Sequence, residues 1–351
     1  MIAAQPAGRH TASSTWQREL AEAFSDPVEL LAALGLTPEM LDPPQTAGRM
    51  RTAAGQFPLR VPRSYAARMR AGDPRDPLLL QVLAQGSELA AAAGYGTDPL
   101  EEQAARKAPG LLHKYAGRAL LVTTGACAVH CRYCFRRHHD YSADQPEQDL
   151  PRWAPALQAL QSDPSIEEII LSGGDPLSLA NPRLEALLTQ LAALPQIRRI
   201  RIHTRTPIAL PARVDVGLLQ LLARVPRELI IVVHANHPRE LDADTAAALQ
   251  KLRQHCRLLL NQSVLLAGVN DDAHTLTALS QRLFECGVLP YYLHQLDHVA
   301  GAAHFEVPDS RALALVAQVN ASLPGYLVPK LVREVPGAAA KLPVQSSLDP
   351  A

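Results

Sequence analysis

From Arg118 onward the sequence alternates short, continuous apolar runs with stretches of helical periodicity. The six runs are RALLVTTG, IEEIILSGG, IRRIRIHT, ELIIVVHAN, RLLLNQSVLLAG and VLPYYLHQLD, and amphipathic segments such as 182–193 and 243–254 lie between them. Continuously apolar strands are typical of a parallel sheet covered on both faces, and their alternation with helices indicates consecutive βα units. Six such units predict an α/β fold, as a barrel, a partial barrel or a doubly wound sheet.

Polar side chains gather where the predicted strands end. They lie at 172–175, 203–206, 234–237, 261–263 and 294–297. In α/β barrels the rim formed by the carboxyl ends of the strands is where sites are built, so we expect the functional residues there. A seventh apolar run, GYLVPKLVREV, precedes the segment PGAAAKLPV near the end of the chain.

The first 115 residues follow a different pattern. Segments such as TWQRELAEAF, DPVELLAALG and DPLLLQVLAQGSELAAAAG have apolar residues at helical spacing, and Asp-Pro pairs punctuate them. We therefore predict three regions. A helical N-terminal region covers residues 1–115, the βα units cover 116–325, and a short C-terminal segment covers 326–351.

The composition excludes several classes of protein. The chain has 34 basic and 34 acidic side chains, so its formal net charge is zero and gives no support to a role on nucleic acid or on a membrane surface. No apolar stretch approaches the length of a membrane span, and the N-terminus MIAAQPAGRHTASSTW lacks the apolar core of a secretory signal. We therefore expect a cytoplasmic protein whose five cysteines are reduced thiols.

Three of those cysteines, Cys127, Cys131 and Cys134, lie together in the stretch ACAVHCRYCFRRHHD after the first predicted strand. A structural zinc site needs four ligands, usually as two separated pairs, and a redox dithiol would use only Cys131 and Cys134. A four-iron cluster normally takes four thiolates, so three would leave one iron open to another ligand. Three unrelated buried cysteines are a further alternative, which the rarity of cysteine disfavours.

The spacing of the cysteines, the strand before them and Tyr133 ahead of the last one resemble the radical S-adenosylmethionine (SAM) superfamily. The resemblance implies a partial (βα)6 barrel of the radical SAM type. It also implies a [4Fe–4S] cluster on the three cysteines, whose open iron binds S-adenosylmethionine for cleavage to an adenosyl radical. The stretch after the second strand, with Gly173, Gly174 and Asp175, would bind the methionine end of that cofactor, since glycines let a backbone approach a ligand closely.

A second resemblance joins the cysteine motif to the end of the chain. The segment REVPGAAAKLPV is similar to the PGGGGK-like segment of the lysine 2,3-aminomutase family, which carries pyridoxal 5′-phosphate on a lysine. Lys341 matches that lysine, although 338–340 are alanines where the family has glycines. The stretch LHKYAGRALL matches the segment whose two cations hold the pyridoxal phosphate group, which implies that role for Lys114 and Arg118. Two cations beside one dianion are electrostatically favourable.

The same resemblance implies a binding site for L-lysine. Arg136 would hold the substrate carboxylate, while Asp297 and Glu334 would hold its ε-ammonium, and the family more often has aspartate at the second of these positions. His234 and Gln262 would line the S-adenosylmethionine pocket. The radical would remove a hydrogen from the β-carbon of lysine, and the nitrogen would migrate from the α-carbon to the β-carbon with the help of pyridoxal phosphate.

Within the family, the chain resembles the shorter bacterial enzymes of the elongation factor P (R)-β-lysylation branch. Free lysine aminomutases carry a longer C-terminal extension with metal-binding cysteines, whereas this chain ends ten residues after Lys341 and has no cysteine after Cys286. The branch converts (S)-α-lysine to (R)-β-lysine, which a partner ligase attaches to elongation factor P. An external reductant such as flavodoxin or ferredoxin would supply electrons.

Three alternatives remain at this point. The first is a catabolic or biosynthetic lysine 2,3-aminomutase. The second is an aminomutase for another amino acid such as glutamate, which would keep the cysteines and Lys341 but not the paired acids Asp297 and Glu334. The third is an iron–sulfur protein without catalytic activity, which would need no pyridoxal site.

The cysteine assignment predicts a clear difference between the five cysteines. Cys131→Ala should lose cluster iron and all cleavage of S-adenosylmethionine, because the cluster then lacks one of three thiolates. Cys256→Ala, outside the motif, should keep both. Iron content per chain and 5′-deoxyadenosine release measure the two properties. Full iron content in the Cys131→Ala protein would contradict the assignment.

Overall fold

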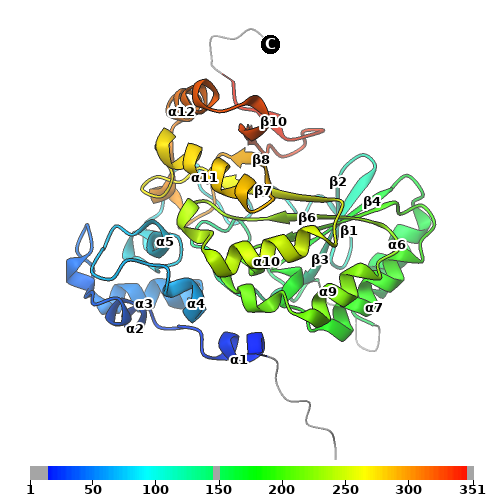
Figure 1. Ribbon diagram of the computed structural model, residues 1–351, viewed down its shortest axis with the longest axis horizontal. Helices are drawn as coiled ribbons and strands as arrows, with labels where there is room; N and C mark the ends of the chain where they lie inside the picture. Colours follow the sequence, from blue (N-terminus) through cyan, green and yellow to red (C-terminus); the bar gives the residue numbers. More distant parts are fainter. Residues whose placement is uncertain (1–14, 145–150, 346–351) are drawn as a thin grey trace, which may run out of the picture.

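The computed structural model describes residues 15–144 and 151–345. A sheet of ten strands in sequence order forms its centre, and each strand from β3 to β8 pairs in parallel with the next. The six predicted apolar runs and the seventh run are all strands of this parallel part (Figure 1), which confirms the partial barrel. These strands are β3 (Arg118–Thr124), β4 (Glu168–Gly173), β5 (Arg199–Thr204), β6 (Glu228–Val233), β7 (Leu258–Val264), β8 (Leu289–His294) and β9 (Lys330–Arg333).

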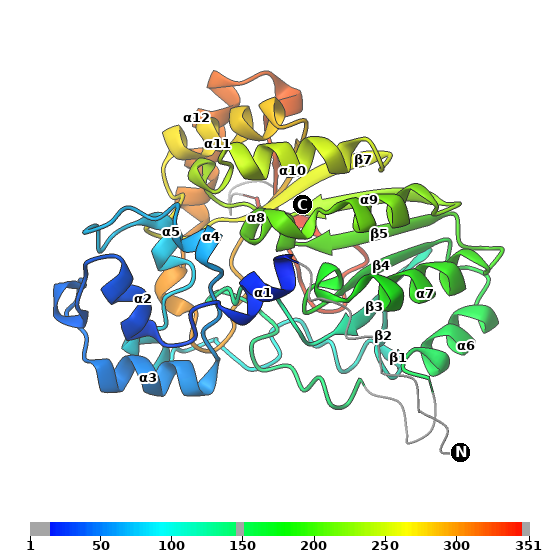
Figure 2. The same ribbon diagram turned by 60° about the horizontal axis from the view of Figure 1, so that its bottom comes forward.

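Helices connect consecutive parallel strands and cover the outer face of the sheet (Figure 2). They are α6 (Ala154–Ser162), α7 (Asn181–Ala192), α8 (Thr206–Ala209), α9 (Val216–Ala223), α10 (Ala243–Arg253), α11 (Ala273–Glu285) and α12 (Asp309–Ser322). Short 3₁₀ helices occur at η1 (Pro38–Met40), η2 (Gly86–Leu89), η3 (Pro176–Ser178), η4 (Pro211–Arg213), η5 (Pro238–Glu240), η6 (Ala303–Phe305) and η7 (Gly325–Leu327).

Antiparallel strands extend the sheet at both edges. β1 (Arg106–Ala108) and β2 (Leu111–Tyr115) precede β3, and β10 (Leu342–Pro343) follows β9. A helical region was predicted up to residue 115 and a separate segment from residue 326. The sheet instead includes β1 and β2 before residue 116 and β9 and β10 after residue 325. The short edge strands lack the long apolar runs of buried strands, so periodicity did not indicate them.

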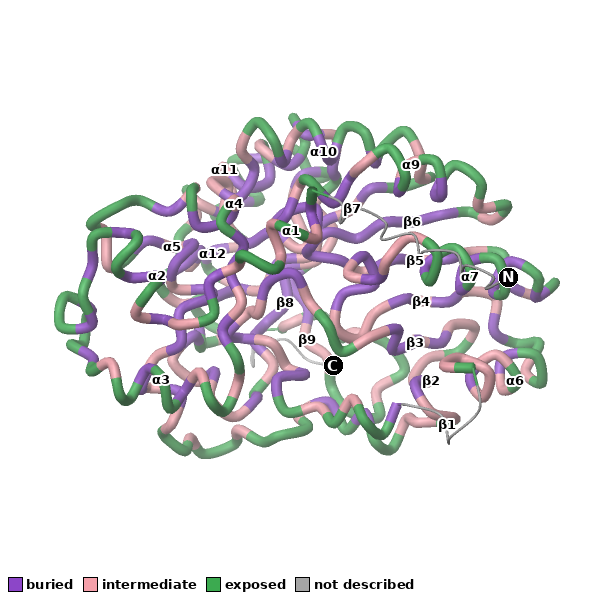
Figure 3. The backbone as a smooth tube through the Cα atoms, turned by 90° about the horizontal axis from the view of Figure 1, so that it is seen from below, coloured by how far each residue is buried: buried purple, intermediate pink, exposed green. Residues whose placement is uncertain are grey.

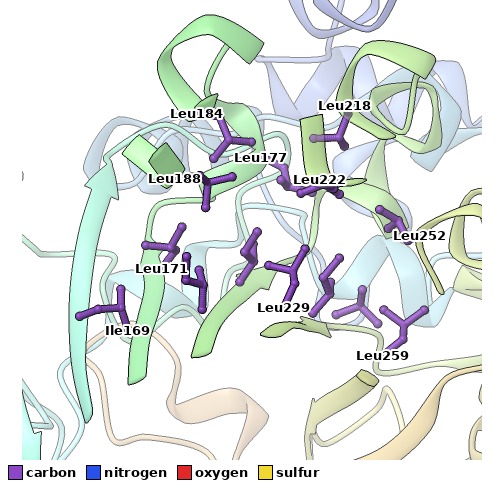
Figure 4. Packing of buried hydrophobic residues seen from close by; sticks show 14 of the residues in the cluster. Ile169, Leu171, Leu177, Leu184, Leu188, Leu218, Leu222, Leu229, Leu252 and Leu259 are labelled. Atoms are coloured by element: carbon purple, nitrogen blue, oxygen red, sulfur yellow. The ribbon is translucent and has the colours of Figure 1, made fainter. Parts of the chain in front are cut away.

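Alternate side chains of the parallel strands point to opposite faces of the sheet. Ile169 and Leu171 of β4 face the same side as Leu184 and Leu188 of α7, as Figure 4 shows, and all four are buried in one apolar cluster. Burying each such side chain contributes about 1.5–3 kcal/mol. The tube of β6 is buried along almost its whole length (Figure 3). The outer face of the sheet is therefore the main core of the protein.

The inner face of the sheet is more polar than the outer face. The residues of β4 and β5 that alternate with the core isoleucines and leucines are all partly accessible, and all but Ile170 are polar: Glu168, Ile170, Ser172, Arg199, Arg201 and His203. A closed, side-chain-filled barrel core would instead be made of branched apolar residues. The inner face can therefore accept polar ligands.

The N-terminal helices form a second core that packs against the rim at the carboxyl ends of the strands. These helices are α1 (Thr15–Ala21), α2 (Pro27–Ala33), α3 (Ala47–Gln56), α4 (Arg63–Ala66) and α5 (Pro77–Leu80), and Figure 1 shows α2 to α5 beside the barrel. Their apolar cluster includes Val129, from the cysteine loop after β3, and Ala209, from the helix after β5. The region thus supports the loops in which the predicted site residues lie.

A buried charge cluster also joins the N-terminal region to the cysteine loop. Arg132 is fully buried and donates to both carboxylate oxygens of Glu88 through Nε and Nη2, and Arg137 Nη2 lies 2.6 Å from Glu88 Oε2. Removing one partner of such a buried cluster leaves an uncompensated charge, which is strongly destabilising. Among the described residues, no helix is long and apolar enough to span a membrane.

Gly174 allows the loop after β4 to pack directly on the start of the cysteine loop. A Cβ there would lie 2.4 Å from the carbonyl oxygen of Ala126 and 2.8 Å from the carbonyl carbon of Gly125, both of them backbone atoms. Gly174→Ala should therefore lower the free energy of unfolding by about 1–3 kcal/mol through overpacking. Thermal or denaturant unfolding measures the change.

Gly48 in α3 provides the matched control, because a Cβ at that position would meet no atom within 4 Å. Gly48→Ala should leave stability unchanged or raise it by up to about 1 kcal/mol, since alanine favours a helix. Equal stabilities of the two variants would contradict the packing argument.

Candidate active site

Three predicted site residues from distant parts of the chain form one ion-pair cluster on the inner face. Lys341 Nζ lies 2.5 Å from Glu334 Oε2, and Lys114 Nζ of β2 lies 3.2 Å from Glu334 Oε1. The aromatic ring of Tyr292, on β8, has its centroid 6.0 Å from Lys341 Nζ. The resemblance assigned these residues to different groups, but in this structure Glu334 binds both lysines.

The two lysines determine the ionisation of Glu334. Burial by itself would raise the pKa of this carboxyl group, but the charges and hydrogen bonds of Lys341 and Lys114 outweigh it and lower the pKa to about 2. Tyr115 is a further hydrogen-bond partner of Glu334. Glu334 is therefore a carboxylate at every physiological pH.

Asp297 lies at the same cluster but has the opposite shift. Burial and the negative charge of Glu334 raise the pKa of Asp297 to about 7, although Lys341 and Lys114 act against the shift. Two nearby carboxyl groups with pKa values pushed apart are typical of a functional site. An additional cation between them would stabilise the ionised form of both.

Arg136 lies at the rim, where it was predicted, but its guanidinium already has a partner. Its Nε and Nη2 atoms donate to the two carboxylate oxygens of Glu102, each at 2.7 Å, and Nη1 donates to Ser172 Oγ at 3.0 Å. The same Glu102 carboxylate lies 3.6 Å from Lys114 Nζ. Glu102 thus holds the guanidinium through Nε and Nη2, while Nη1 is directed to the loop after β4.

Glu102 is the main site residue that sequence reasoning missed. It is 4% exposed and precedes β1 in a segment without helical or strand periodicity. Burial would raise the pKa of this carboxyl group, but the charge of Arg136 and its hydrogen bonds keep it lowered. No local sequence pattern indicates a salt bridge that spans 34 residues between two loops.

Three histidines line the inner face near these charges. The rings of His203 and His234 meet edge to face with centroids 5.9 Å apart, and His294 follows along the sheet. Burial lowers the pKa of His234 and of His294 to about 3, so both are neutral. The buried Nε2 atom of each of the three rings has no hydrogen-bond partner among the described residues.

Unpaired buried polar atoms are rare in native proteins and indicate a missing ligand or water. The three imidazoles thus fit a polar cofactor on the inner face. Of the other predicted cofactor residues, Gln262 lies on β7 opposite Tyr292, and the Arg118 guanidinium stacks 4.7 Å from the centre of the Tyr115 ring. Both lie on the strands of this face.

The cysteine loop follows β3, as predicted, and Cys127, Cys131 and Cys134 are close enough to affect one another. Burial, followed by the charge of Cys131, raises the pKa of Cys134 to about 11. Arg205 Nη1 lies 2.7 Å from Cys131 Sγ. The described residues contain no cluster tight enough to bind a single metal ion, whereas a four-iron cluster binds each thiolate to a different iron. Three adjacent thiols with a cationic donor fit such a cluster.

The stretch Gly173–Asp175 has a structural role in addition to the predicted one. Both glycines pack against the backbone of 123–126, so their lack of a side chain serves contact between loops. The Asp175 carboxylate accepts from Thr204 Oγ1 at 2.7 Å and from the backbone amides of Arg205, at 2.7 Å, and Leu177, at 2.9 Å. Asp175 therefore joins the rims of β4 and β5, and the contact of this stretch with S-adenosylmethionine stays a prediction.

Known proteins resemble this chain over most of its length. The sequence profile of the radical SAM superfamily matches residues 121–277. The L-lysine 2,3-aminomutase of Escherichia coli (strain K12) is 48% identical over 333 residues, which cover 95% of each chain. That of Haemophilus influenzae is 44% identical over 93% of this chain and 94% of its own. That of Clostridium subterminale is 35% identical, over 80% of this chain and 67% of its own.

The raised pKa of Asp297 predicts a pH-dependent change in stability. Between the pKa of an unfolded aspartate, 3.8, and the folded value of about 7, the folded state binds more protons, so this group makes stability fall as pH rises. Asp297→Asn removes that loss. The Tm of the variant minus that of the wild type should be larger at pH 8 than at pH 5 by about 2 °C or more, because the loss grows as pH rises through this window.

Thermal unfolding of the cofactor-free proteins at both pH values measures the effect. Asp309 offers a control with the opposite shift. Burial alone would raise the pKa of its carboxyl group, but the hydrogen bonds of Arg333 and Gln295 outweigh burial and lower the pKa. Asp309→Asn should give no such gain at pH 8. A constant difference between Asp297→Asn and the wild type across this pH range would contradict the raised pKa.

Proposed function

The chain belongs to the L-lysine 2,3-aminomutase family of radical SAM isomerases, and from that premise we propose that it converts (S)-α-lysine to (R)-β-lysine with pyridoxal 5′-phosphate on Lys341. The observation that carries the proposal is the cluster in which Lys341, Glu334 and Lys114 meet beside Asp297. A lysine, two carboxyl groups and a second cation on one polar inner face are the groups that this reaction requires.

The residues around Lys341 fit pyridoxal phosphate. Lys341 supplies the amine, and Lys114 and Arg118 supply cations for the phosphate. The unpaired Nε2 atoms of His203 and His294 offer hydrogen-bonding partners to a polar group on the same face. When bound, pyridoxal phosphate supplies the unsaturated system through which an amino group can migrate between carbons.

The rim fits the [4Fe–4S] cluster and S-adenosylmethionine that the superfamily uses. Cys127, Cys131 and Cys134 would hold the cluster on the loop after β3, and His234 and Gln262 would line the pocket for S-adenosylmethionine below it. When bound, these two groups together supply a radical that can remove a hydrogen atom. The N-terminal helices cover this rim and would limit access of water to the radical.

The charges of the cluster select for lysine. In the cofactor-free chain the Lys341 ammonium balances Glu334, and once Lys341 carries the cofactor its nitrogen is no longer a free ammonium. The ε-ammonium of lysine would replace it between Glu334 and Asp297. The side chain of glutamate would instead bring a third carboxylate to two acids, which costs several kcal/mol by repulsion and loss of water.

At the other end of the substrate, Arg136 would bind the α-carboxylate. Glu102 holds the guanidinium on one edge and keeps its plane fixed, so Arg136 is already oriented before lysine binds. Such preorganisation reduces the entropy lost on binding. Lysine is thus held by opposite charges at its two ends, with the carbons that react between them.

The identities to the matched relatives support the branch that the sequence resembles. This chain is 48% and 44% identical to the enzymes of Escherichia coli and Haemophilus influenzae, and 35% identical to the enzyme of Clostridium subterminale. We therefore propose that the product, (R)-β-lysine, passes to a ligase that modifies elongation factor P in the cytoplasm. A flavodoxin or ferredoxin would supply the electron for the cluster.

Product identification tests the proposal. Reconstituted enzyme, incubated without oxygen with L-lysine, S-adenosylmethionine and a reductant, should form β-lysine, and borohydride reduction should attach the pyridoxal group to Lys341. Asp297→Asn should lower kcat/KM for lysine about a hundredfold if about 3 kcal/mol of transition-state binding is lost. Both cofactors should remain bound, because Asp297 holds neither.

A control variant and a second substrate complete the test of product formation. Lys330 on β9 is an exposed lysine near Lys341 in sequence, and Lys330→Ala should keep full activity whereas Lys341→Ala should lose it. Formation of a β-amino acid from glutamate but not from lysine would refute the substrate. Pyridoxal label on a lysine other than Lys341 would refute the cofactor site.

A further inference from the structure

Arg205 has an unusual position for a buried cation. It follows directly after β5, is 5% exposed, and points Nη1 at the sulfur of Cys131, 2.7 Å away. The same Nη1 lies 2.5 Å from the hydroxyl of Tyr133, in the cysteine loop itself. A guanidinium therefore donates directly to one of the three thiols assigned to the cluster.

The rest of the guanidinium is fixed by neutral and charged acceptors. Nη2 donates to Gln81 Oε1 at 2.7 Å, to Glu240 Oε2 at 2.8 Å and to the Tyr65 hydroxyl at 3.1 Å. The backbone amide of Arg205 donates to Asp175. These contacts come from the N-terminal helices and from the loops after β4 and β6. Arg205 is thus held at the sulfur from several directions.

The counter-charge of Arg205 contacts a different nitrogen of the guanidinium from the sulfur. Glu240 is fully buried, and its other oxygen accepts from the backbone amides of Asn236 at 2.8 Å and His237 at 3.0 Å. Glu240 contacts Nη2, whereas Cys131 contacts Nη1. The sulfur therefore contacts the cation of a buried ion pair directly, while the carboxylate of that pair contacts the other terminal nitrogen.

A hydrogen bond and a positive charge at a ligand sulfur change the redox chemistry of an iron–sulfur cluster. Reduction adds one electron, so the reduced cluster is more negative and gains more from a nearby cation than the oxidised one. No bond to Arg205 forms or breaks, and the electron comes from an external reductant.

From this geometry we infer that Arg205 sets the reduction potential of the cluster, raising it through Cys131 so that a weaker reductant can load the electron. Arg205 acts through the sulfur and is a positioning residue. The inference rests on the cluster assignment within the proposed function and adds a residue that the cysteine motif does not contain.

The potential of the cluster, measured by redox titration with electron paramagnetic resonance, tests the inference without using activity. The double variant Arg205→Gln/Glu240→Gln removes both charges together, so that no unpaired charge is buried. At the potential where the wild-type cluster is half reduced, the double variant should have a ratio of reduced to oxidised cluster about tenfold lower than the wild type. This corresponds to a potential lower by about 59 mV for one electron. The single variant Glu240→Gln should shift the ratio in the opposite direction.

Arg213→Gln is the matched control. Arg213 is also a fully buried arginine, but it donates to the backbone carbonyls of Leu177 and Leu179 and not to a cysteine. Its replacement should leave the potential unchanged. Arg205→Lys, which keeps the charge, should lie between the wild type and the double variant.

The possible results separate the two claims. An unchanged potential in the double variant, with a fully loaded cluster, would overturn the inference while leaving the cluster assignment intact. Loss of the cluster in both the double variant and Arg205→Lys, but not in Arg213→Gln, would also overturn it, because Arg205 would then serve assembly only. Failure of the wild-type chain to bind any cluster would refute the proposed function itself.

Discussion

The alternation of side chains along seven parallel strands determines what the two faces of this sheet can do. On β4 and β5, Ile169, Leu171 and Ile202 are buried against helices, so the residues between them must face inward. Those inward residues are not needed for the outer core. They are therefore free to be charged or aromatic, and the inner face becomes the site. The rim is then assembled by loops that hold one another through Gly174 and Asp175.

The parts of the fold that sequence could predict are those with a physical period. Parallel strands covered on both faces must be apolar throughout, so all seven apolar runs were recognisable, and the polar residues that follow them marked the rim. The edge strands β1, β2 and β10 are short and partly exposed, and no periodicity distinguishes them from loops. The candidate site residues were predicted from resemblance, because Lys341 and Lys114 alone are ordinary lysines in a sequence.

The pairings between those residues could not have been read from the chain. Glu102 with Arg136 and Glu240 with Arg205 are buried pairs between loops separated by more than thirty residues. A buried charge is stable only with a partner, but sequence does not say which of 34 acidic groups will be that partner. Asp175 is a further case, since its carboxylate holds the loops after β4 and β5 together, a contact that the motif alone does not indicate.

The site keeps charges in an arrangement that stability alone would not select. Asp297 and Glu334 stand close enough that the ionisation of one opposes that of the other, and three imidazoles have buried nitrogens that find no partner within residues 15–144 and 151–345. Each feature raises the free energy of the folded chain, and the outer core compensates for it. A ligand that brings a cation to the acids and acceptors or donors to the imidazoles recovers that energy on binding. The acids that repel each other and the imidazoles with unpaired nitrogens are therefore the groups to which lysine and its proposed cofactors would bind most tightly.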